Sequence, residues 1–251
     1  MLTNLQYQIL KKIAPSRPNY CNGSAYAEKS KLSVLMGEDF FDRIKNKVVV
    51  DFGCGEGAEV VEMAQRGAKT VIGWDIRKEM LDAAQERSIE HDVHDICIFT
   101  SSMVLMANRR VDAIVSLDAF EHFSDPASVL HLMNFFLKPK GEVFVSFGPT
   151  WYHPYGGHSF VAFPWSHILC DEKALVRWRS QFHHDKAQKF SEVPGGLNQM
   201  TVKRFEKLVE ASPFKFASFE TVPIKKLRYF QNRLTREFTT AVIRARLVKR
   251  T

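Results

Sequence analysis

The sequence predicts an α/β fold in which a mostly parallel, seven-stranded sheet carries helices on both faces. A β-branched apolar run, Val48 to Phe52, ends in glycines, as a buried parallel strand does before a tight turn. Strand and helix patterns then alternate as far as residue 147, which is typical of a doubly wound sheet. Hydrophobic residues make up 45% of the 251 residues, enough for one large core, and no apolar run is long enough to span a membrane.

The expected elements begin with an amphipathic helix over residues 2–14, ended by Pro15. One side of this helix holds Leu2, Leu5, Ile9, Leu10 and Ile13. Residues 24–44 are expected to be helical again. The alternating core follows as strand 48–52, helix 58–66, strand 70–75, helix 78–90, strand 95–100, strand 111–116, helix 126–137 and strand 142–147.

Residues 148–196 interrupt this alternation with prolines, glycines and many aromatic residues. A compact α/β unit does not need so long a connection, and long loops are often functional. Regular structure is expected to resume with a helix over 201–211 and strands over 214–222 and 238–248. One domain, 1–251, with an insertion at 148–196 is the simplest organisation.

The net charge of +7 is concentrated near the C-terminus, where residues 201–251 hold 13 Lys and Arg against 4 Glu. Such a region attracts phosphates, an anionic lipid surface or an acidic substrate, although a solvated surface is the more ordinary interpretation. The N-terminal residues lack the features of a secretory signal, and the four cysteines show no C-x-x-C spacing. A cytoplasmic protein with free thiols is expected.

The turn after the first strand contains Gly53, Gly55 and Gly57, and a helix pattern follows it. Backbone N–H groups of such a turn can approach a ligand closely, because no Cβ stands in the way. Asp51 precedes the glycines, where it would repel a pyrophosphate and attract an ammonium group. Asp75 ends the next strand at the spacing of a ribose-binding acid. These residues favour a ligand with a ribose and an amino acid over a dinucleotide; a turn that binds nothing is the bland alternative.

At this point the sequence resembles the class I methyltransferases that use S-adenosylmethionine, with their Rossmann-like sandwich. Asp51–Gly57 matches their first motif, and Asp75 matches their ribose-binding acid. Residues 111–123 and 137–141 resemble the type-11 family, which includes the ubiquinone-pathway O-methyltransferases.

The resemblance implies a division of the chain and a set of cofactor-binding residues. Residues 1–45 would be a helical lid over the cofactor, 45–147 the cofactor-binding core, 148–196 a substrate-side insertion, and 197–251 the C-terminal helix and final strands. The glycines would surround the methionine part, Asp75 would bind the ribose, and Ile76 would pack on adenine. Ser102 stands where many relatives have an Asp for the adenine amino group, and a hydroxyl accepts more weakly. The implied cofactor-binding set is Asp51, Gly53, Cys54, Gly55, Gly57, Asp75, Ile76, Ser101, Ser102, Met103, Leu117 and Asp118.

A possible metal site follows the fourth core strand. Asp118, Glu121 and His122 match a Glu-x-x-Glu-His stretch that is implicated in divalent-metal binding in the ubiquinone-pathway enzymes. Two carboxylates and an imidazole could hold Mg or Zn, and the cation would favour an oxyanion nucleophile. The alternative is a helix-start feature without metal.

The insertion is the predicted acceptor pocket. Its candidate substrate-binding residues are Trp151, Tyr152, Tyr155, His158, Phe163 and Trp165. His158, His153 and His122 are the candidate catalytic residues, since histidines can titrate near neutral pH and serve as bases. The alternative is a loop that packs its own small core.

The function predicted from these residues is methyl transfer from S-adenosylmethionine to a small molecule, at oxygen. The alternatives are a nucleic-acid methyltransferase, a non-catalytic protein that binds S-adenosylmethionine and a nicotinamide oxidoreductase. The fourth core strand ends in Ser-Leu-Asp-Ala and not in the Asn/Asp-Pro-Pro-aromatic turn of nucleic-acid amino methylases. Asp51 disfavours the oxidoreductase. The acceptor and the oligomeric state are left open by the sequence.

Overall fold

In the computed structural model, the described residues are 2–16, 29–102, 110–193 and 196–250. They form a seven-stranded sheet in the order β3-β2-β1-β4-β5-β7-β6. β7 runs antiparallel to both of its neighbours, and the other strand pairs are parallel. The strands are β1 Val48–Phe52, β2 Thr70–Trp74, β3 Cys97–Thr100, β4 Val111–Leu117, β5 Leu137–Phe147, β6 Phe214–Pro223 and β7 Thr240–Lys249. The predicted fold class is confirmed.

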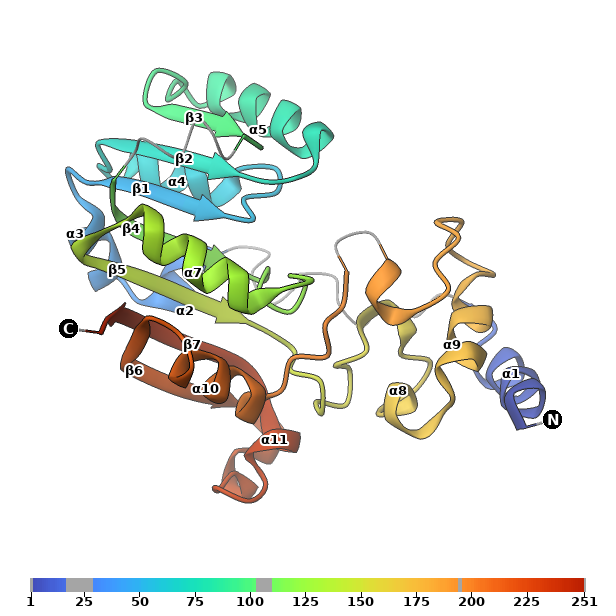
Figure 1. Cartoon of the computed structure of the whole chain (residues 1–251). Coiled ribbons are helices and arrows are strands. Elements are labelled where there is room, and N and C mark those ends of the chain that lie inside the picture. The colour runs from blue at the N-terminus through green and yellow to red at the C-terminus, as the bar shows by residue number, and fades with distance from the viewer. Residues whose placement is uncertain (1, 17–28, 103–109, 194–195, 251) are drawn as a thin grey trace.

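Two apolar layers cover the sheet, as the alternation of strand side chains requires. One face packs α7 (Pro126–Phe136) and α10 (Val202–Glu210) in a core that includes Val50, Phe120 and Phe205. The other face packs α2 (Lys31–Met36), α3 (Asp39–Ile44), α4 (Ala58–Gln65) and α5 (Lys78–Glu90). Figure 1 shows α7 and α10 in front of the sheet with α2 and α3 behind it.

The N-terminus of α7 is capped. Asp125 accepts a hydrogen bond from the Ser128 amide, and Pro126 occupies the first turn, where its missing N–H is not needed. β5 begins earlier than expected, at Leu137, directly after α7. The sequence Lys138-Pro139-Lys140-Gly141 therefore lies inside the strand, where a register shift between Val111 and Ala113 of β4 accommodates it.

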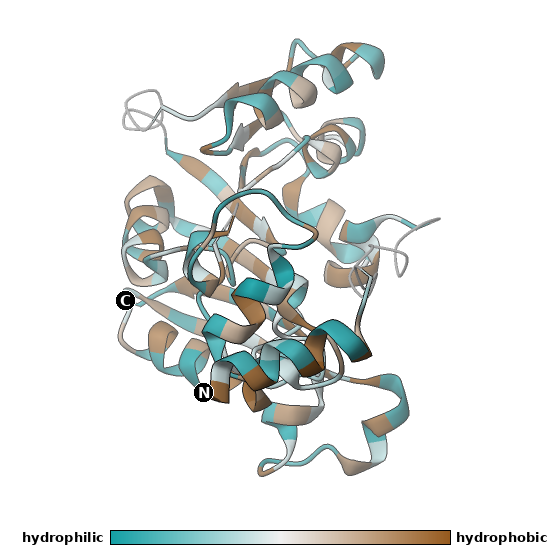
Figure 2. Cartoon of the chain, turned by 90° about the vertical axis from the view of Figure 1, so that its right-hand side faces the viewer, coloured by the Kyte–Doolittle hydropathy of each residue, from teal (hydrophilic) through white to brown (hydrophobic). Residues whose placement is uncertain are grey.

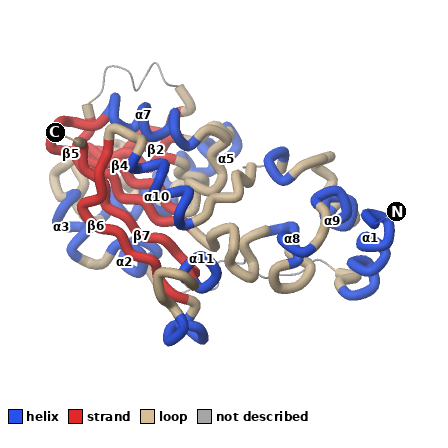
Figure 3. The backbone as a smooth tube through the Cα atoms, turned by 60° about the horizontal axis from the view of Figure 1, so that its bottom comes forward, coloured by secondary structure: helices blue, strands red, loops and turns tan. Residues whose placement is uncertain are grey.

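The insertion and the N-terminal helix form a small lobe with its own core. This lobe contains α1 (Leu2–Ile13), α8 (Ser166–Leu169), α9 (Glu172–Arg179) and the short 3-10 helices His158–Phe160 and Phe190–Glu192. Trp178 is fully buried there, and its indole N–H donates to the Ala14 carbonyl over 2.9 Å. The lobe stands beyond the carboxyl end of β5 in Figures 1 and 3.

The placement of α1 corrects two expectations. It packs against α9 of the insertion, where Arg177 donates to Asn4, and not over the glycine turn as a lid. Of the five apolar residues on one side of this helix, only Leu10 is buried. Leu2, Leu5, Ile9 and Ile13 remain exposed on the helix that faces the viewer in Figure 2.

The C-terminal region also differs from the prediction. Residues 236–239 form a short helix, α11 (Arg236–Thr239), so β7 starts at Thr240 and not at Phe238. A 3-10 helix, Lys225–Phe230, lies in the same connection between β6 and β7. Among the described residues, no helix is long and apolar enough to cross a bilayer.

Candidate functional site

The glycine turn and the first residues after β2 and β4 form one pocket, the glycine-loop pocket, of about 330 Å³. It lies at the carboxyl ends of adjacent strands β1 and β4, from which the chain continues in opposite directions across the sheet. Its lining residues are Lys31, Asp51, Gly53, Cys54, Gly55, Glu56, Ala58, Glu59, Arg77, Met80, Arg87, Leu117 and Asp118. Six of the predicted cofactor-binding residues are in this set.

The three glycines have different tasks. A Cβ at Gly53 would lie 2.7 Å from the Ala119 Cβ, and one at Gly57 would lie 2.7 Å from the Ala84 Cβ, so both allow close packing. A Cβ at Gly55 would meet only the Arg77 guanidinium, at 4.0 Å, on the pocket side. Gly55 has φ +51° and its amide donates to Asp75 over 3.0 Å. Gly55 is therefore the glycine of this turn whose missing Cβ leaves open space in the pocket.

Asp51 and Lys31 place an acid and a cation in the pocket. Asp51 is 2% exposed, and its pKa is raised well above the usual range, first by burial and then by Glu59. The Lys31 ammonium lies 2.9 Å from Asp118 and 3.4 Å from Glu59. Burial disfavours its charge, but these carboxylates outweigh burial and raise its pKa. The sequence analysis missed Lys31, because it lies twenty residues before Asp51 on α2 and no local motif marks it.

Asp75 is also buried, 4% exposed, and forms four hydrogen bonds. The amides of Gly55 and Arg77 donate to it, over 3.0 and 2.9 Å, and the Arg77 guanidinium donates twice, each over 3.0 Å. Burial would raise the pKa of Asp75, but these donors lower it below its usual range. Asp75 is thus ionised and held in a fixed orientation at the pocket.

The described residues among the remaining cofactor predictions do not line this pocket. Ile76 is 74% exposed, and Ser101 is exposed at the end of β3. The Ser102 amide donates to the Thr100 hydroxyl over 2.9 Å. Met103 lies outside the described residues.

A second cavity of about 350 Å³, the histidine cavity, lies where the small lobe meets the turn after β4. It is lined by His122, His158, Ser159, Arg179, His183, Asp185, Val193, Gly196 and Leu197. The rings of His122 and His158 pack edge to face, with centroids 5.2 Å apart. The structure thus brings together two of the three predicted catalytic histidines, from segments 36 residues apart.

His122 is oriented by the chain. Its Nδ1 lies 2.7 Å from the Gly196 carbonyl oxygen, and a carbonyl only accepts. Nδ1 therefore carries the proton, and Nε2 is left as the accepting nitrogen. Burial lowers the pKa of His122, which keeps the ring neutral.

The prediction that the insertion histidines titrate near neutral pH is wrong for this structure. Burial lowers the pKa of His158 to about 3, and the neighbouring His122 contributes in the same direction. Burial likewise lowers the pKa of His153 to about 4. Moreover, His153 Nδ1 accepts from the Tyr155 amide over 3.0 Å, and His153 does not line the histidine cavity.

The five predicted aromatic substrate residues pack against other parts of the protein. Trp151 contacts His167 and Phe190, and Trp151 and Phe163 both pack against the core of the small lobe. The Trp165 indole donates to the Tyr152 carbonyl over 2.9 Å. Tyr152 packs on Phe238, and Tyr155 packs on His153. None of these five lines the histidine cavity, so their packing favours the alternative of a loop with its own core.

The sequence analysis also missed Arg179 and Asp185 in this cavity. Their side chains form a two-pronged ion pair, with distances of 2.9 and 2.6 Å, and Arg179 also donates to Ser159. The pair lowers the pKa of Asp185 to about 2. Only the fold of the insertion brings these residues to His122, so no motif could have indicated them.

The metal prediction is not supported by the geometry. Within the part of the chain that is described, no three His, Cys, Asp or Glu side chains are grouped to hold a metal ion. Asp118 is paired with Lys31, and His122 is held by Gly196. Glu121 is 2% exposed, and burial followed by the charge of Asp118 raises its pKa to about 8.

Two residues of this region have unusual backbone conformations. Asp118 has φ 47° and His158 has φ 50°, although neither is glycine. A left-handed backbone conformation costs a non-glycine residue of order 1–3 kcal/mol, and such residues cluster at functional sites. Asp118 lines the glycine-loop pocket and His158 lines the histidine cavity, which is consistent with a functional role.

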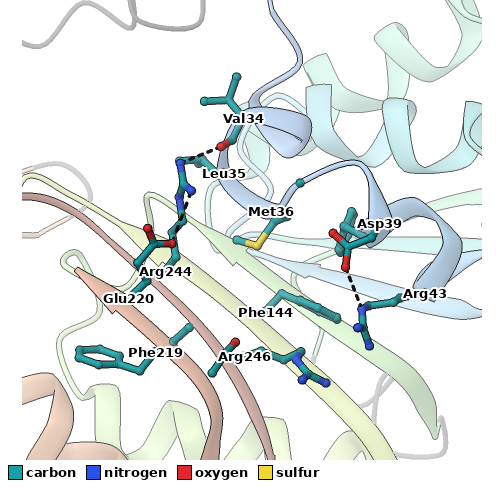
Figure 4. Close-up of a pocket in the computed structure, with 14 residues that line it drawn as sticks. Val34, Leu35, Met36, Asp39, Arg43, Phe144, Phe219, Glu220, Arg244 and Arg246 are labelled. Carbon is teal, nitrogen blue, oxygen red and sulfur yellow. Dashed lines mark hydrogen bonds and ion pairs between the residues drawn. The ribbon is translucent and has the colours of Figure 1, made fainter. Parts of the chain in front are cut away.

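A larger cavity of about 420 Å³ lies away from these two. It is formed by α2 and α3 against β5, β7 and β6, with Arg244 donating to the Val34 carbonyl (Figure 4). Its arginines pair with acids, as Arg244 does with Glu220, and Arg43 and Arg246 do with Glu142. It contains none of the predicted site residues, and we do not assign a ligand to it.

Comparisons with known proteins agree with the fold and the first motif. Residues 50–145 match the family model described as a methyltransferase domain. A ubiquinone biosynthesis O-methyltransferase of Chromobacterium violaceum is 37% identical over 113 residues, which cover 43% of this chain and 48% of the relative. One of Neisseria meningitidis is 28% identical over 144 residues, or 56% of this chain and 53% of the relative. The chain thus matches about half the length of these curated relatives.

Two solved structures share the fold at lower identity. The geranyl diphosphate C-methyltransferase of Streptomyces coelicolor has a TM-score of 0.58 and 16% identity, covering 87% of this chain and 77% of that one. The magnesium protoporphyrin IX methyltransferase of Synechocystis, solved with bound S-adenosylhomocysteine, has a TM-score of 0.54 and 17% identity, covering 87% and 80%. At this identity the likeness concerns the fold.

Proposed function

Because residues 50–145 of this chain form a methyltransferase domain of the type-11 family, we propose that the protein transfers a methyl group from S-adenosylmethionine to oxygen of a small molecule. The observation that carries the proposal is the set of charges in the glycine-loop pocket. Asp51 and Lys31 line it as a buried acid and a cation, and the Asp75 carboxylate accepts from the Gly55 amide of the same glycine turn.

The residues present fit S-adenosylmethionine group by group. Asp51 faces the pocket, where a ligand ammonium would restore the charge that burial disfavours. Lys31, on the same pocket wall, would bind the carboxylate of the amino acid part. Asp75 would accept hydrogen bonds from the ribose hydroxyls, and the exposed Ile76 would cover the adenine. The sulfonium supplies a methyl group with a good leaving group.

The histidine cavity is the proposed acceptor site. It adjoins the glycine-loop pocket, since Asp118 lines one and His122, four residues later, lines the other. The acceptor hydroxyl would donate to Nε2 of His122, which takes its proton as the oxygen attacks the methyl carbon. The carbon–oxygen bond forms as the carbon–sulfur bond breaks, and the sulfonium becomes a neutral thioether. The small lobe would exclude water and hold the reacting atoms in line.

Hydroxyl-bearing intermediates of ubiquinone biosynthesis are the first acceptors to test, because the relatives are named for that pathway. The protein is incubated with S-adenosylmethionine labelled in the methyl group and with such compounds or a metabolite extract. We expect an O-methylated product and S-adenosylhomocysteine in equal amounts. Label in RNA, DNA or an amine would contradict the proposed acceptor class, and binding without any turnover would favour the non-catalytic alternative.

We further propose that the basic C-terminal region contacts an anionic lipid surface through the connection between β6 and β7. Tyr229, Phe230 and Leu234 are 81%, 67% and 89% exposed there. Arg228 lies over the Tyr229 ring at 4.6 Å, and Arg233 is in the same segment. Exposed rings beside cations suit a membrane interface, because apolar parts can insert while the charges meet phosphates. Sedimentation with phosphatidylglycerol vesicles, compared with phosphatidylcholine vesicles, tests this contact. Equal binding to both, or to neither, would contradict it.

A further inference from the structure

Arg77 occupies the part of Asp75 that a ribose would need. A carboxylate has about four acceptor positions, and all four of Asp75 are used. The two backbone donors are the amides of Gly55 and Arg77, and the other two are Nε and Nη2 of the Arg77 guanidinium. A ribose diol also requires two acceptor positions, so the diol and the guanidinium cannot both bind Asp75 in this way.

We propose that Arg77 competes with the cofactor ribose for Asp75, and that its guanidinium leaves this carboxylate when the cofactor binds. The inference rests on the proposed function, because it presumes a cofactor with a ribose diol. Arg77 would thus set the affinity of the protein for its cofactor without being required for methyl transfer.

The geometry makes this exchange feasible at Asp75. The two amide donors belong to the backbone and keep the carboxylate in place when the guanidinium leaves. The ribose hydroxyls can then take over the vacated positions, so no acceptor remains unsatisfied in the complex.

The Arg77 side chain is able to leave. It is 40% exposed and lines the mouth of the pocket, whereas the Asp75 side chain is only 5% exposed. Its guanidinium therefore already has access to solvent in the paired form. The cost is a two-pronged ion pair, which the cofactor must replace before its own contacts contribute to affinity.

Arg87 provides a matched control in the same pocket. It lines the glycine-loop pocket as Arg77 does, but its guanidinium contacts Glu56 and not Asp75. Arg87→Met therefore removes the same charge from the same wall and leaves Asp75 as it is. Any effect of local charge on a cationic cofactor is common to both variants.

The test is calorimetric titration of S-adenosylmethionine and of S-adenosylhomocysteine into the wild type, Arg77→Met, Arg77→Lys and Arg87→Met. We expect Arg77→Met to bind both ligands about three- to tenfold more tightly, because no fraction of the protein is held in the paired form. Arg77→Lys, which keeps the charge but cannot form the two-pronged contact, is expected between the two. Arg87→Met should show a smaller gain.

A double-variant cycle separates competition from a structural role. In the Asp75→Asn background the Arg77→Met gain should disappear, because the shared carboxylate is absent. Equal or weaker binding by a folded Arg77→Met protein would overturn the inference and leave the proposed function standing. If Arg77→Met does not fold, Arg77→Lys decides by the same criterion. A wild type that binds neither ligand would overturn both proposals.

Discussion

The glycine-loop pocket and the histidine cavity meet at the Asp118–His122 turn, but their construction differs. The first is built from short segments at the carboxyl ends of β1, β2 and β4, and backbone amides fix its key carboxylate. The second depends on contacts between residues far apart in sequence, such as His122 with Gly196 and with His158. Carboxylates and cations line the first, while the second combines two desolvated histidine rings with the Arg179–Asp185 ion pair.

This difference indicates how each region can vary. The position of a strand end follows from the sheet, so Asp75 and the glycine turn are expected to keep their places when surrounding loops change. The histidine cavity follows from the packing of one insertion, so its chemistry can be altered without disturbing the cofactor. Substitutions that change only cofactor affinity or only turnover would support this contrast between the two regions. Substitutions that change both equally would contradict it.

The largest expected effect is on catalysis at the histidine cavity. His122→Ala should lower kcat by about 10²–10⁴-fold if Nε2 takes the acceptor proton, with S-adenosylmethionine affinity changed less than about threefold. His153→Ala is the matched control, since its ring accepts from the Tyr155 amide and does not line the cavity. Steady-state kinetics and calorimetry check both. Wild-type turnover in His122→Ala, or an equal loss in His153→Ala, would rule out this role.

The sequence predicted the glycine-loop pocket well because its residues are tied to local patterns. Asp51 and Gly55 belong to one strand and turn, and Asp75 directly follows the neighbouring parallel strand, β2. Parallel strands place their carboxyl ends together whatever the rest of the chain does. Lys31 was not predicted from the sequence, because its place in the pocket depends on how α2 packs on the sheet.

The histidine cavity was predicted only in part, for a physical reason. The aromatic residues of the insertion satisfy each other in a local core, and a sequence pattern cannot distinguish this from a ligand pocket. The pKa values of His158 and His153 were also beyond prediction, since desolvation is a property of the folded environment.

The next effect is on cofactor binding through the backbone. Gly55→Val should weaken S-adenosylmethionine binding about tenfold or more, because a β-branched residue resists the left-handed φ and moves the amide away from Asp75. Gly67→Val is a control with φ +95° outside the pocket. Its thermal stability should fall comparably while calorimetry finds wild-type affinity. Normal binding by Gly55→Val would contradict the assigned role of this turn.

A smaller effect is expected for Lys31. If its ammonium binds the cofactor carboxylate, Lys31→Met should weaken S-adenosylhomocysteine binding about three- to tenfold. The expected loss is moderate because Asp118 and Glu59 already pair with this ammonium. The 5′-methylthioadenosine molecule lacks the amino acid part, so its affinity should not change. Equal loss for both ligands would mean that Lys31 supports the pocket in general and does not contact the carboxylate.

The smallest expected effect is a fraction of a proton at Asp51. Burial, followed by Glu59, raises the pKa of this carboxyl in the free protein, although Lys31 opposes the shift. A ligand ammonium would favour the ionised form and lower the pKa again. Cofactor binding should therefore release protons at pH values near the raised pKa, and affinity should rise with pH through it. Calorimetry in phosphate and in Tris measures the release, because the two buffers differ in ionisation enthalpy. Asp51→Asn should bind more weakly and release fewer protons. Identical binding enthalpies in both buffers for the wild type would show that no proton is released at Asp51 when the ligand binds. The proposed link between ammonium binding and the pKa of Asp51 would then be wrong.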